Sequence, residues 1–266
     1  MGDFPKTLYK FRDWTNPFHK EVLTKRTLYL ASPKDFNDPF DCRISKNYLS
    51  LSDPKKMEKY QKMVLSRQVP KIIEEGRDLK DSLLEIRKRL SDLPKFQKEG
   101  EKIYFESQDK HYGVISFSTV WDNILLWSHY ANNHRGFCIG LSEKKLRDSN
   151  RFGVGGIVNY EKKYPFIDPS DEFMMENYLT ETHTKAKDWE YENEFRLTKL
   201  FFPNVPSNKD RLVTFENDAI TEVILGLRIS DYDKKEILSS LPNKSIPVYQ
   251  IQQIPFEFKI ERKRIN

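Results

Sequence analysis

The stretch from residue 111 to residue 141 most limits how this chain can fold. It holds two short apolar runs, 114–119 and 136–141, whose length and composition are typical of buried strands. Between them, residues 122–131 have the spacing of a helix, and polar and aromatic side chains crowd the segment beyond what core packing requires. The pattern predicts two strands joined through a short helix, with functional side chains between them.

Short strands and helices alternate over most of the chain. Residues 7–12 alternate as a strand, and Asn16 followed by Pro17 is a strong helix start. A second strand is expected at 28–31, followed by a structured loop at 32–41. Further strands are expected around Ile157 and at 192–200, 221–227, 246–252 and 256–262, with helices near 171–187 and from Ser230.

A segment from about residue 52 to residue 109 has a different period. Leu79, Leu83, Ile86 and Leu90 recur at spacings of three and four, with charges of both signs between them. This spacing predicts a helical insertion. The whole chain, 1–266, is therefore expected to form a single α+β domain with a mixed or split central sheet and this insertion.

Composition excludes several classes of protein. Lys and Arg number 45 against 40 Asp and Glu, so the formal net charge is +5, which permits a polyanionic partner without establishing one. Cys42 and Cys138 show no CxxC spacing, which argues against a zinc site and a disulfide scaffold. No run approaches the roughly 18 apolar residues of a membrane span. A cytoplasmic protein with no bound metal and no membrane contact is the expectation.

A charged motif near residue 190 carries candidate chemistry. Glu192, Glu194 and Arg196 alternate in WEYENEFRL, so a strand would place all three on one face. Carboxylates in a cleft act as bases, nucleophiles or stabilisers of a developing cation. The competing interpretation is a solvated strand face, since such faces are common on antiparallel sheets. In a polar cleft, a Glu194→Gln change would reduce activity and barely alter stability.

Histidines and aromatic residues of the 111–141 stretch have two interpretations each. His129 and His134 lack the third nearby ligand of a catalytic zinc site, so hydrogen-bonded structural histidines are favoured. Trp121, Trp127 and Tyr130 suit either the core or a platform that stacks on a nicotinamide or a base.

Two weaker patterns concern ligands of other kinds. Asn37, Asp38 and Asp41 can bind a cation or a ribose, although such loops usually satisfy their own backbone. Glu257 and Lys259 form an E-x-K pair on an expected strand, which is one element of a metal-dependent nuclease. Tripeptides of this kind occur often by chance.

Five motifs, in order along the chain, resemble those of a bacterial family catalogued as domain of unknown function twenty-nine seventy-one. The resemblance extends over the whole chain, and the family name carries no activity. The matching motifs are LYKFR at 8–12, LYLASPKDFNDPFD at 28–41, SFSTVWDNILLWSHYANNHRGFCIGL at 116–141, WEYENEFRL at 189–197 and EVILGL at 222–227.

A looser resemblance links the chain to the ADP-ribosyltransferase fold. That superfamily has an early strand bearing Arg or His, a mid-chain serine or aromatic residue, and a late strand carrying E-x-E. Arg12 matches the basic residue, Ser116 or Ser118 the serine, and Glu192 and Glu194 the E-x-E pair. The resemblance implies that NAD is the substrate, held by Arg12, by the serine and by the neighbouring side chains Trp127, His129 and Tyr130.

The same resemblance implies an enzyme that transfers ADP-ribose to a nucleic-acid or protein acceptor. A role as a bacterial toxin or anti-phage effector, with an antitoxin or other regulatory partner, follows from it. The serine motif is not the usual S-T-S, and the insertion has no counterpart, which leaves the choice between Glu192 and Glu194 open. The alternatives are a non-catalytic module that binds a nucleotide or a partner and, third, a metal-dependent nuclease.

Overall fold

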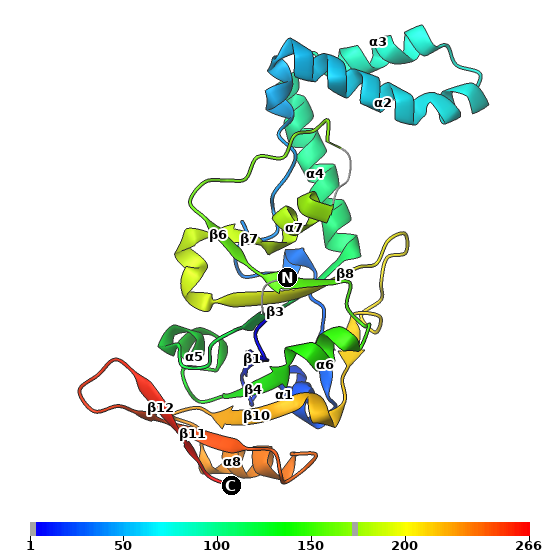
Figure 1. Cartoon of the computed structure of the whole chain (residues 1–266). Helices are drawn as coiled ribbons and strands as arrows, with labels where there is room; N and C mark the ends of the chain where they lie inside the picture. Colours follow the sequence, from blue (N-terminus) through cyan, green and yellow to red (C-terminus); the bar gives the residue numbers. More distant parts are fainter. Residues whose placement is uncertain (1–3, 172–174) are drawn as a thin grey trace.

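The computed structural model describes residues 4–171 and 175–266 and has an α+β fold (Figure 1). Its main feature is an eight-stranded mixed sheet in the order β12-β11-β10-β4-β1-β3-β8-β5. The strands are β1 (Thr7–Arg12), β2 (Thr27–Tyr29), β3 (Tyr112–Ser118), β4 (Phe137–Ser142), β5 (Val154–Ile157), β6 (Asn159–Glu161), β7 (Thr184–Ala186), β8 (Glu194–Leu200), β9 (Leu212–Thr214), β10 (Ile220–Leu225), β11 (Val248–Gln253) and β12 (Ile260–Arg264).

Helices cover the sheet and extend beyond it. Two small sheets, β2-β9 and β6-β7, complete the fold. The α-helices are α1 (Pro17–Thr24), α2 (Pro54–Glu74), α3 (Leu79–Arg89), α4 (Leu93–His111), α5 (Ile124–Tyr130), α6 (Glu143–Asp148), α7 (Met175–His183) and α8 (Asp231–Ser239), and the 3-10 helices are η1 (Pro33–Asp35), η2 (Tyr48–Ser52), η3 (Lys187–Glu192) and η4 (Asn217–Ala219).

The large sheet is split between β1 and β3. These two strands are in register at one position only, where Tyr9 faces Ser118. By contrast, β1 pairs with β4 from Thr7 to Arg12, and β3 pairs with β8 from Tyr112 to Ser118. The two halves of the sheet therefore separate on one side of that bridge. Of the expected mixed or split sheet, the mixed form is confirmed.

Alternate side chains of β1 pack into two different hydrophobic clusters, one on each face of the strand. Leu8 joins a cluster that includes Val22 and Leu23 of α1, whereas Tyr9 and Phe11 join a cluster with α5. The start of α1 follows the predicted chemistry, because the Asn16 side chain accepts a hydrogen bond from the backbone N–H of Phe18 at 3.0 Å. The short β1–α1 connection consequently fixes both faces at once.

The insertion is helical, as its periodicity predicts. Helices α2 and α3 extend away from the large sheet at the top of Figure 1, and α4 returns the chain to β3. A small core of its own holds this segment together, centred on Leu51, Tyr60, Ile86 and Leu90. The insertion thus adds a projecting surface without altering the strand order of the sheet.

Several expected elements differ in their bounds, three of them as follows. The strand expected at 192–200 begins at Glu194, because Asn193 takes a left-handed conformation with φ 45° and ends the 3-10 helix η3. The last strand begins at Ile260, and residues 256–259 form an exposed turn. The helix expected near 171–187 is α7, which ends at His183, because residues 184–186 form strand β7 instead. Residues 172–174 of that prediction lie outside the described residues.

Candidate functional site

A cavity of about 1110 Å³ lies where β1 and β3 separate. Strands β1 and β3, helices α1 and α5 and the turn η3 all contribute side chains to it. Most of the sequence-predicted site residues meet there although they are distant in sequence. They are Arg12, Ser116, Ser118, His129, Tyr130, Glu192 and Glu194.

Trp127 is the exception among the predicted ligand-binding residues. Its side chain is fully buried, its Nε1 donates to the carbonyl oxygen of Trp121 at 2.7 Å, and its ring meets Phe11 edge-on at 5.1 Å. Helix α5 has only two turns, so one face of it must supply core. Trp127 is therefore a core residue and does not face a ligand in this cavity, which corrects the expectation of a cofactor contact.

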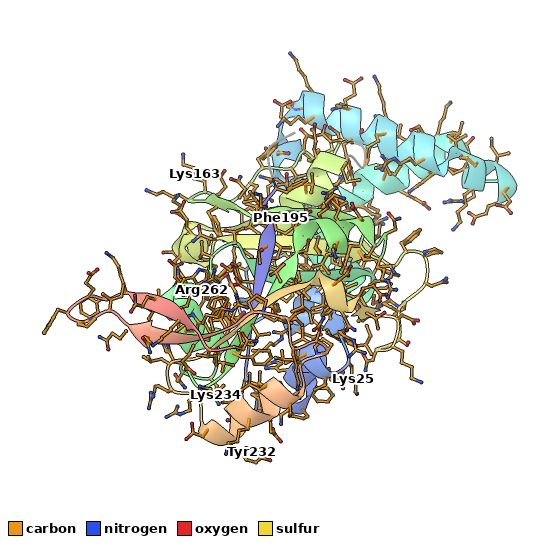
Figure 2. The ribbon with its side chains drawn as sticks, turned by 60° about the horizontal axis from the view of Figure 1, so that its bottom comes forward. Lys25, Lys163, Phe195, Tyr232, Lys234 and Arg262 are labelled. Atoms are coloured by element: carbon orange, nitrogen blue, oxygen red, sulfur yellow. The ribbon has the colours of Figure 1, made fainter. Side chains whose placement is uncertain are left out.

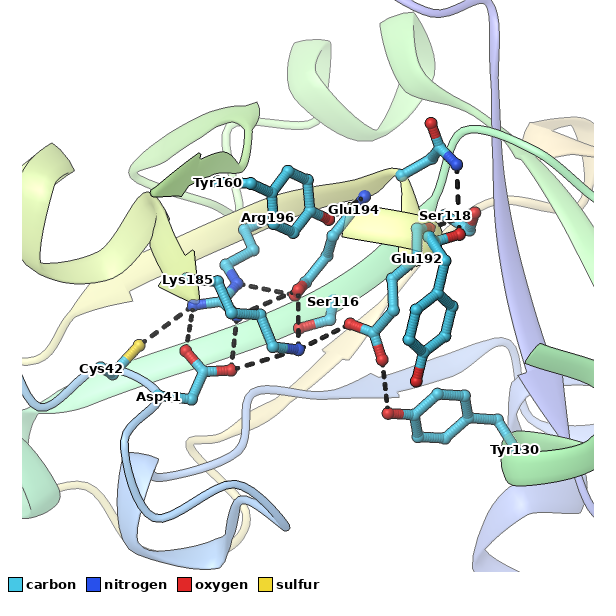
Figure 3. A network of polar contacts seen from close by, with 12 residues as sticks. Asp41, Cys42, Ser116, Ser118, Tyr130, Tyr160, Lys185, Glu192, Glu194 and Arg196 are labelled. Carbon is cyan, nitrogen blue, oxygen red and sulfur yellow. Dashed lines mark hydrogen bonds and ion pairs between the residues drawn. The ribbon is translucent and has the colours of Figure 1, made fainter. Parts of the chain in front are cut away.

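The central interaction beside the cavity is a buried arginine, Arg196 of β8 (Figure 3). Its Nη1 and Nη2 donate to the two carboxylate oxygens of Asp41 at 2.8 and 2.6 Å. Its Nε donates to Oε1 of Glu194 at 2.6 Å, and Nη1 also reaches the carbonyl oxygen of Thr182 at 2.8 Å. Paired, planar contacts of this kind suit a guanidinium and would not suit a lysine.

Lys185 of β7 connects this arginine cluster to the turn before β8. Its Nζ lies 2.6 Å from Oε2 of Glu192, 3.3 Å from Oε2 of Glu194 and 3.6 Å from Oδ2 of Asp41. We call Asp41, Lys185, Glu192, Glu194 and Arg196 the ionic cluster. Three carboxylates against two cations give the ionised cluster one net negative charge.

Glu194 is held as an anion. Burial alone would raise the pKa of this carboxyl, but Arg196 and Lys185 outweigh burial and lower the pKa to about 2. The hydroxyl of Ser116 adds a hydrogen bond to the carboxylate, and the backbone N–H of Glu194 donates to the Tyr160 hydroxyl at 2.8 Å. A solvated strand face does not fit this burial, so that interpretation is wrong. For a carboxylate paired in such a buried cluster, we expect Glu194→Gln to lower stability and not to leave it unchanged.

Glu192 lies in the η3 turn, off the strand, and is oriented from several sides. Ser118 Oγ donates to its carbonyl oxygen at 2.7 Å, and the Tyr130 hydroxyl donates to its Oε1 at 2.7 Å. Asn123 fixes the same turn by donating to the carbonyl oxygen of Tyr191 at 2.6 Å. The left-handed Asn193 then brings Glu192 and Glu194 to the same lysine from different elements.

Arg12, on the β1 side of the cavity, has no carboxylate partner in residues 4–171 and 175–266. Its Nη1 makes a long hydrogen bond of 3.5 Å to the carbonyl oxygen of Phe11. Burial lowers the pKa of Arg12 to about 10, which leaves it charged at neutral pH. A desolvated guanidinium without a counter-ion is suited to an anionic ligand.

Lys10 and His19 lie near Arg12, and sequence reasoning missed both. Lys10 Nζ donates to the carbonyl oxygen of Ser116, which the separated strands leave without a β1 partner. Burial, and next Arg12, hold the pKa of Lys10 well below its usual range. His19 Nδ1 accepts from the backbone N–H of Asp13 at 3.2 Å, and burial lowers its pKa to about 4, so a neutral ring faces the cavity.

Two residues of the loop at 32–41 differ in which of the earlier interpretations fits them. Asp38 accepts from the backbone N–H of Phe40 at 2.9 Å and so satisfies its own loop. Asp41 instead pairs with Arg196, so for this residue the self-satisfied loop was the wrong interpretation. Neither a spacing nor a motif linked Asp41 to Lys185 and Arg196, because the contacts join segments far apart in sequence.

The E-x-K pair occupies a different part of the molecule. Glu257 and Lys259 lie in the exposed turn before β12, form an ion pair of 2.8 Å with each other, and do not line the cavity. Within the described ranges, no group of three or more His, Cys, Asp or Glu side chains has the arrangement of a metal site. No helix in the described part of the chain is long and apolar enough to cross a membrane.

Comparison with known families gives one match. Residues 126–197 match a family described as protein of unknown function (DUF2971). This segment contains Tyr130, Lys185, Glu192, Glu194 and Arg196, and it leaves β1 and β3 outside. The resemblance expected over the whole chain is thus confirmed for this segment alone. Comparison with curated proteins and with solved structures yields no match.

Arg196→Met should destabilise the fold by about 3–5 kcal/mol, because it leaves Asp41 and Glu194 buried without their main cation. Urea denaturation measures this change in the free energy of unfolding. The control is Arg135→Met at an exposed arginine, which should change stability by about 0.5 kcal/mol or less. Adding Asp41→Asn and Glu194→Gln to Arg196→Met should recover part of the loss. A cost below about 1 kcal/mol for Arg196→Met would contradict the buried cluster.

Stability should fall in two pH windows. Burial, and next Arg196, lower the pKa of His183 to about 4 from its ordinary 6.5. The unfolded chain therefore binds a proton that the folded chain refuses, and stability declines as pH drops from about 6.5 to 4. Glu194 titrates near 2 when folded and near 4.5 when unfolded, so its contribution is present above 4.5 and lost between 4.5 and 2.

Urea midpoints at several pH values distinguish the two windows. His183→Gln should flatten the decline above pH 4, although His19, whose pKa is also about 4, contributes in the same direction. The decline below pH 4.5 should persist in this variant. Equal slopes in the wild type and His183→Gln would show that His183 protonates freely in the folded protein.

Proposed function

We propose that the protein is an NAD-dependent, ADP-ribosyltransferase-like enzyme for which NAD is a substrate. The observation that supports this most directly is the charge distribution around one cavity: a net negative ionic cluster on the β8 side and an unpaired Arg12 on the β1 side. The volume of about 1110 Å³ exceeds the usual range of small-ligand pockets and suits a dinucleotide.

Arg12 is assigned to the diphosphate of NAD. A guanidinium binds phosphate oxygens through two parallel N–H donors, and partial burial strengthens each contact. His19, neutral and fixed through Nδ1, presents its Nε2–H beside Arg12 as a second donor. Tyr29 and Leu212, both partly exposed, line the same cavity and offer apolar contact to an adenosine.

Glu192 is assigned to the reacting ribose, with Glu194 as a positioning residue. Two cations, Arg196 and Lys185, neutralise Glu194. Glu192 has one cationic partner, Lys185, and one neutral donor, the Tyr130 hydroxyl. The less neutralised carboxylate is the stronger stabiliser of a cation that develops beside it.

The chemistry needs a fixed negative charge more than a proton carrier. The glycosidic C–N bond breaks, its electron pair moves to the nicotinamide nitrogen, and the C1′ carbon becomes part of an oxocarbenium ion. A carboxylate beside the ribose stabilises that ion, as in glycoside hydrolysis. The acceptor then attacks C1′ through a lone pair and loses its proton to solvent or a neighbouring base.

The biological setting of the proposal comes from the resemblance alone. The acceptor class is a nucleic acid or a protein, and the role is that of a bacterial toxin or anti-phage effector. An antitoxin or other regulatory partner would then restrain the activity in a cytoplasmic setting.

A second candidate is a non-catalytic nucleotide-binding module. The observation in its favour is that every carboxylate oxygen of Glu192 and Glu194 already accepts a hydrogen bond, as expected of a structural cluster. Such a module would bind NAD or another nucleotide through Arg12 and would not consume it. The third candidate, a metal-dependent nuclease, is not favoured, because its E-x-K motif lies in the exposed turn before β12, away from the cavity.

Glu192→Gln should lower NAD consumption by about 10²-fold or more, the scale observed when one electrostatic stabiliser is removed. The matched control is Glu190→Gln, two residues earlier in the same turn, whose exposed side chain pairs with Lys187. Nicotinamide release measures the activity, and the melting temperature checks the fold. Equal NAD consumption by both variants, or none by the wild type with any nucleic-acid or protein acceptor, would favour the binding module.

Arg12→Gln should weaken NAD binding by about 10-fold or more, since a hydrogen bond to a charged group contributes about 1.5–3 kcal/mol. The melting temperature should stay level or rise, because an unpaired, desolvated charge is removed. Calorimetric titration of NAD measures the affinity, with the exposed Arg228→Gln as the control. A large fall in melting temperature would instead give Arg12 a structural role.

A further inference from the structure

A row of aromatic rings borders the cavity beside Glu192. The rings of Trp189 and Tyr191 in η3 have centroids 6.1 Å apart, and Tyr191 lies 6.4 Å from His129 of α5. We call these three residues the aromatic edge. All three line the cavity and none is buried.

The aromatic edge is held in place by groups that are not themselves ligands. Asn123 fixes the backbone at Tyr191, and the Lys185 ammonium lies 4.6 Å from the centroid of the Trp189 ring. The rings are thus ordered by the same turn that orients Glu192. Ordered, partly exposed aromatic rings are the usual platform for stacking on planar groups.

A second aromatic feature lies on the hairpin of β11 and β12, next to α5. Phe256 and Phe258 at its tip are about 106% and 95% exposed, and Phe256 has a left-handed φ of 65°. A bulky residue in that conformation is strained, so the fold presents this ring to solvent at a cost in stability. Figure 2 shows the hairpin extending from the body of the protein, with Arg262 nearer its base.

The hairpin and the aromatic edge adjoin the same helix. The Arg262 guanidinium lies 4.8 Å from the ring of Trp121, just before α5, and His129 is on α5 itself. Tyr249 of the hairpin and Tyr191 of η3 pack against one core cluster with Leu126 of α5. The hairpin strand β12 also carries a basic sequence, IERKR, in which Arg262 pairs with Glu222 at 2.6 Å and Lys263 and Arg264 are exposed.

We infer that the hairpin tip and the aromatic edge bind single-stranded nucleic acid, and that one unpaired base at the aromatic edge is the acceptor. The acceptor role rests on the proposed transferase function, whereas the binding does not. Phenylalanine, tyrosine and tryptophan rings stack on bases of any sequence, and β12 supplies positive charge to a phosphate backbone. Paired bases are stacked inside a duplex, so an unpaired strand is the form that such rings recognise.

Binding is tested by fluorescence anisotropy with labelled oligothymidylate and oligouridylate of about 20 nucleotides and with a duplex of equal length, all without NAD. Single strands should bind at least about 10-fold more tightly than the duplex, with an affinity that falls as salt rises. Tyr191→Ala and Phe258→Ser should each weaken binding by about 10-fold.

Two controls keep the result interpretable. Phe166→Ser removes another exposed aromatic residue, beside Lys56 of α2 at the far end of the molecule, and should leave binding unchanged. Phe258→Ser should keep the wild-type melting temperature, because the ring has no buried contact to lose. Equal binding by Phe258→Ser, Tyr191→Ala and the wild type would overturn the inference.

A parallel measurement of NAD consumption separates this inference from the proposed function. If the wild type consumes NAD and labels a protein but binds no single strand, the nucleic-acid inference fails and the transferase function stands. If it binds single strands and never consumes NAD, the transferase function and the acceptor role fail, and the nucleic-acid surface stands. Labelling of a single-stranded oligonucleotide, lost in Tyr191→Ala, supports both.

Discussion

The buried pairing of Arg196 with Asp41 and Glu194 is the interaction on which the candidate site depends. An arginine with no solvent exposure is tolerable only when its donors are satisfied, and here two carboxylates and a backbone carbonyl satisfy them. That requirement fastens the loop containing Asp41 and the end of α7 to β8. The hydrogen bonds of the Arg196 guanidinium therefore hold these irregular segments in place, and the segments then form a defined wall of the cavity.

Local sequence patterns predicted the elements well wherever a local interaction decides the structure. Alternation predicted β1, a short apolar run predicted β4, and the Asn16 and Ser230 caps marked the starts of α1 and α8, because those signals involve neighbours within a few residues. The insertion was recognisable for the same reason. Glu192 was expected on the strand but lies in η3, because Asn193 adopts a left-handed conformation between the two elements. The pattern of charged and aromatic residues does not reveal that conformation.

The candidate site was less predictable because its contacts are long-range. Arg196 and Asp41 are separated by 155 residues, and an alternating Glu-x-Glu-x-Arg pattern is the same whether its face is solvated or buried. Arg12 and Ser116 were assigned through a resemblance, Glu194 was found from the alternating charges of its motif, and Lys10, His19 and Lys185 carried no signal of their own. Trp127 failed for a related reason, since a short helix must give one side to the core whichever residue types it contains.

Because β1 and β3 pair only at Tyr9 and Ser118, the large sheet consists of two halves that are joined by one bridge between these strands. On the open side of that bridge, the Lys10 side chain of β1 donates a hydrogen bond to the Ser116 carbonyl oxygen of β3. A ligand that contacts Arg12 on one half and Glu192 on the other would connect the two halves of the sheet. Its binding free energy would then oppose separation of the two halves, so the sheet would be more rigid when the cavity is occupied than when it is empty.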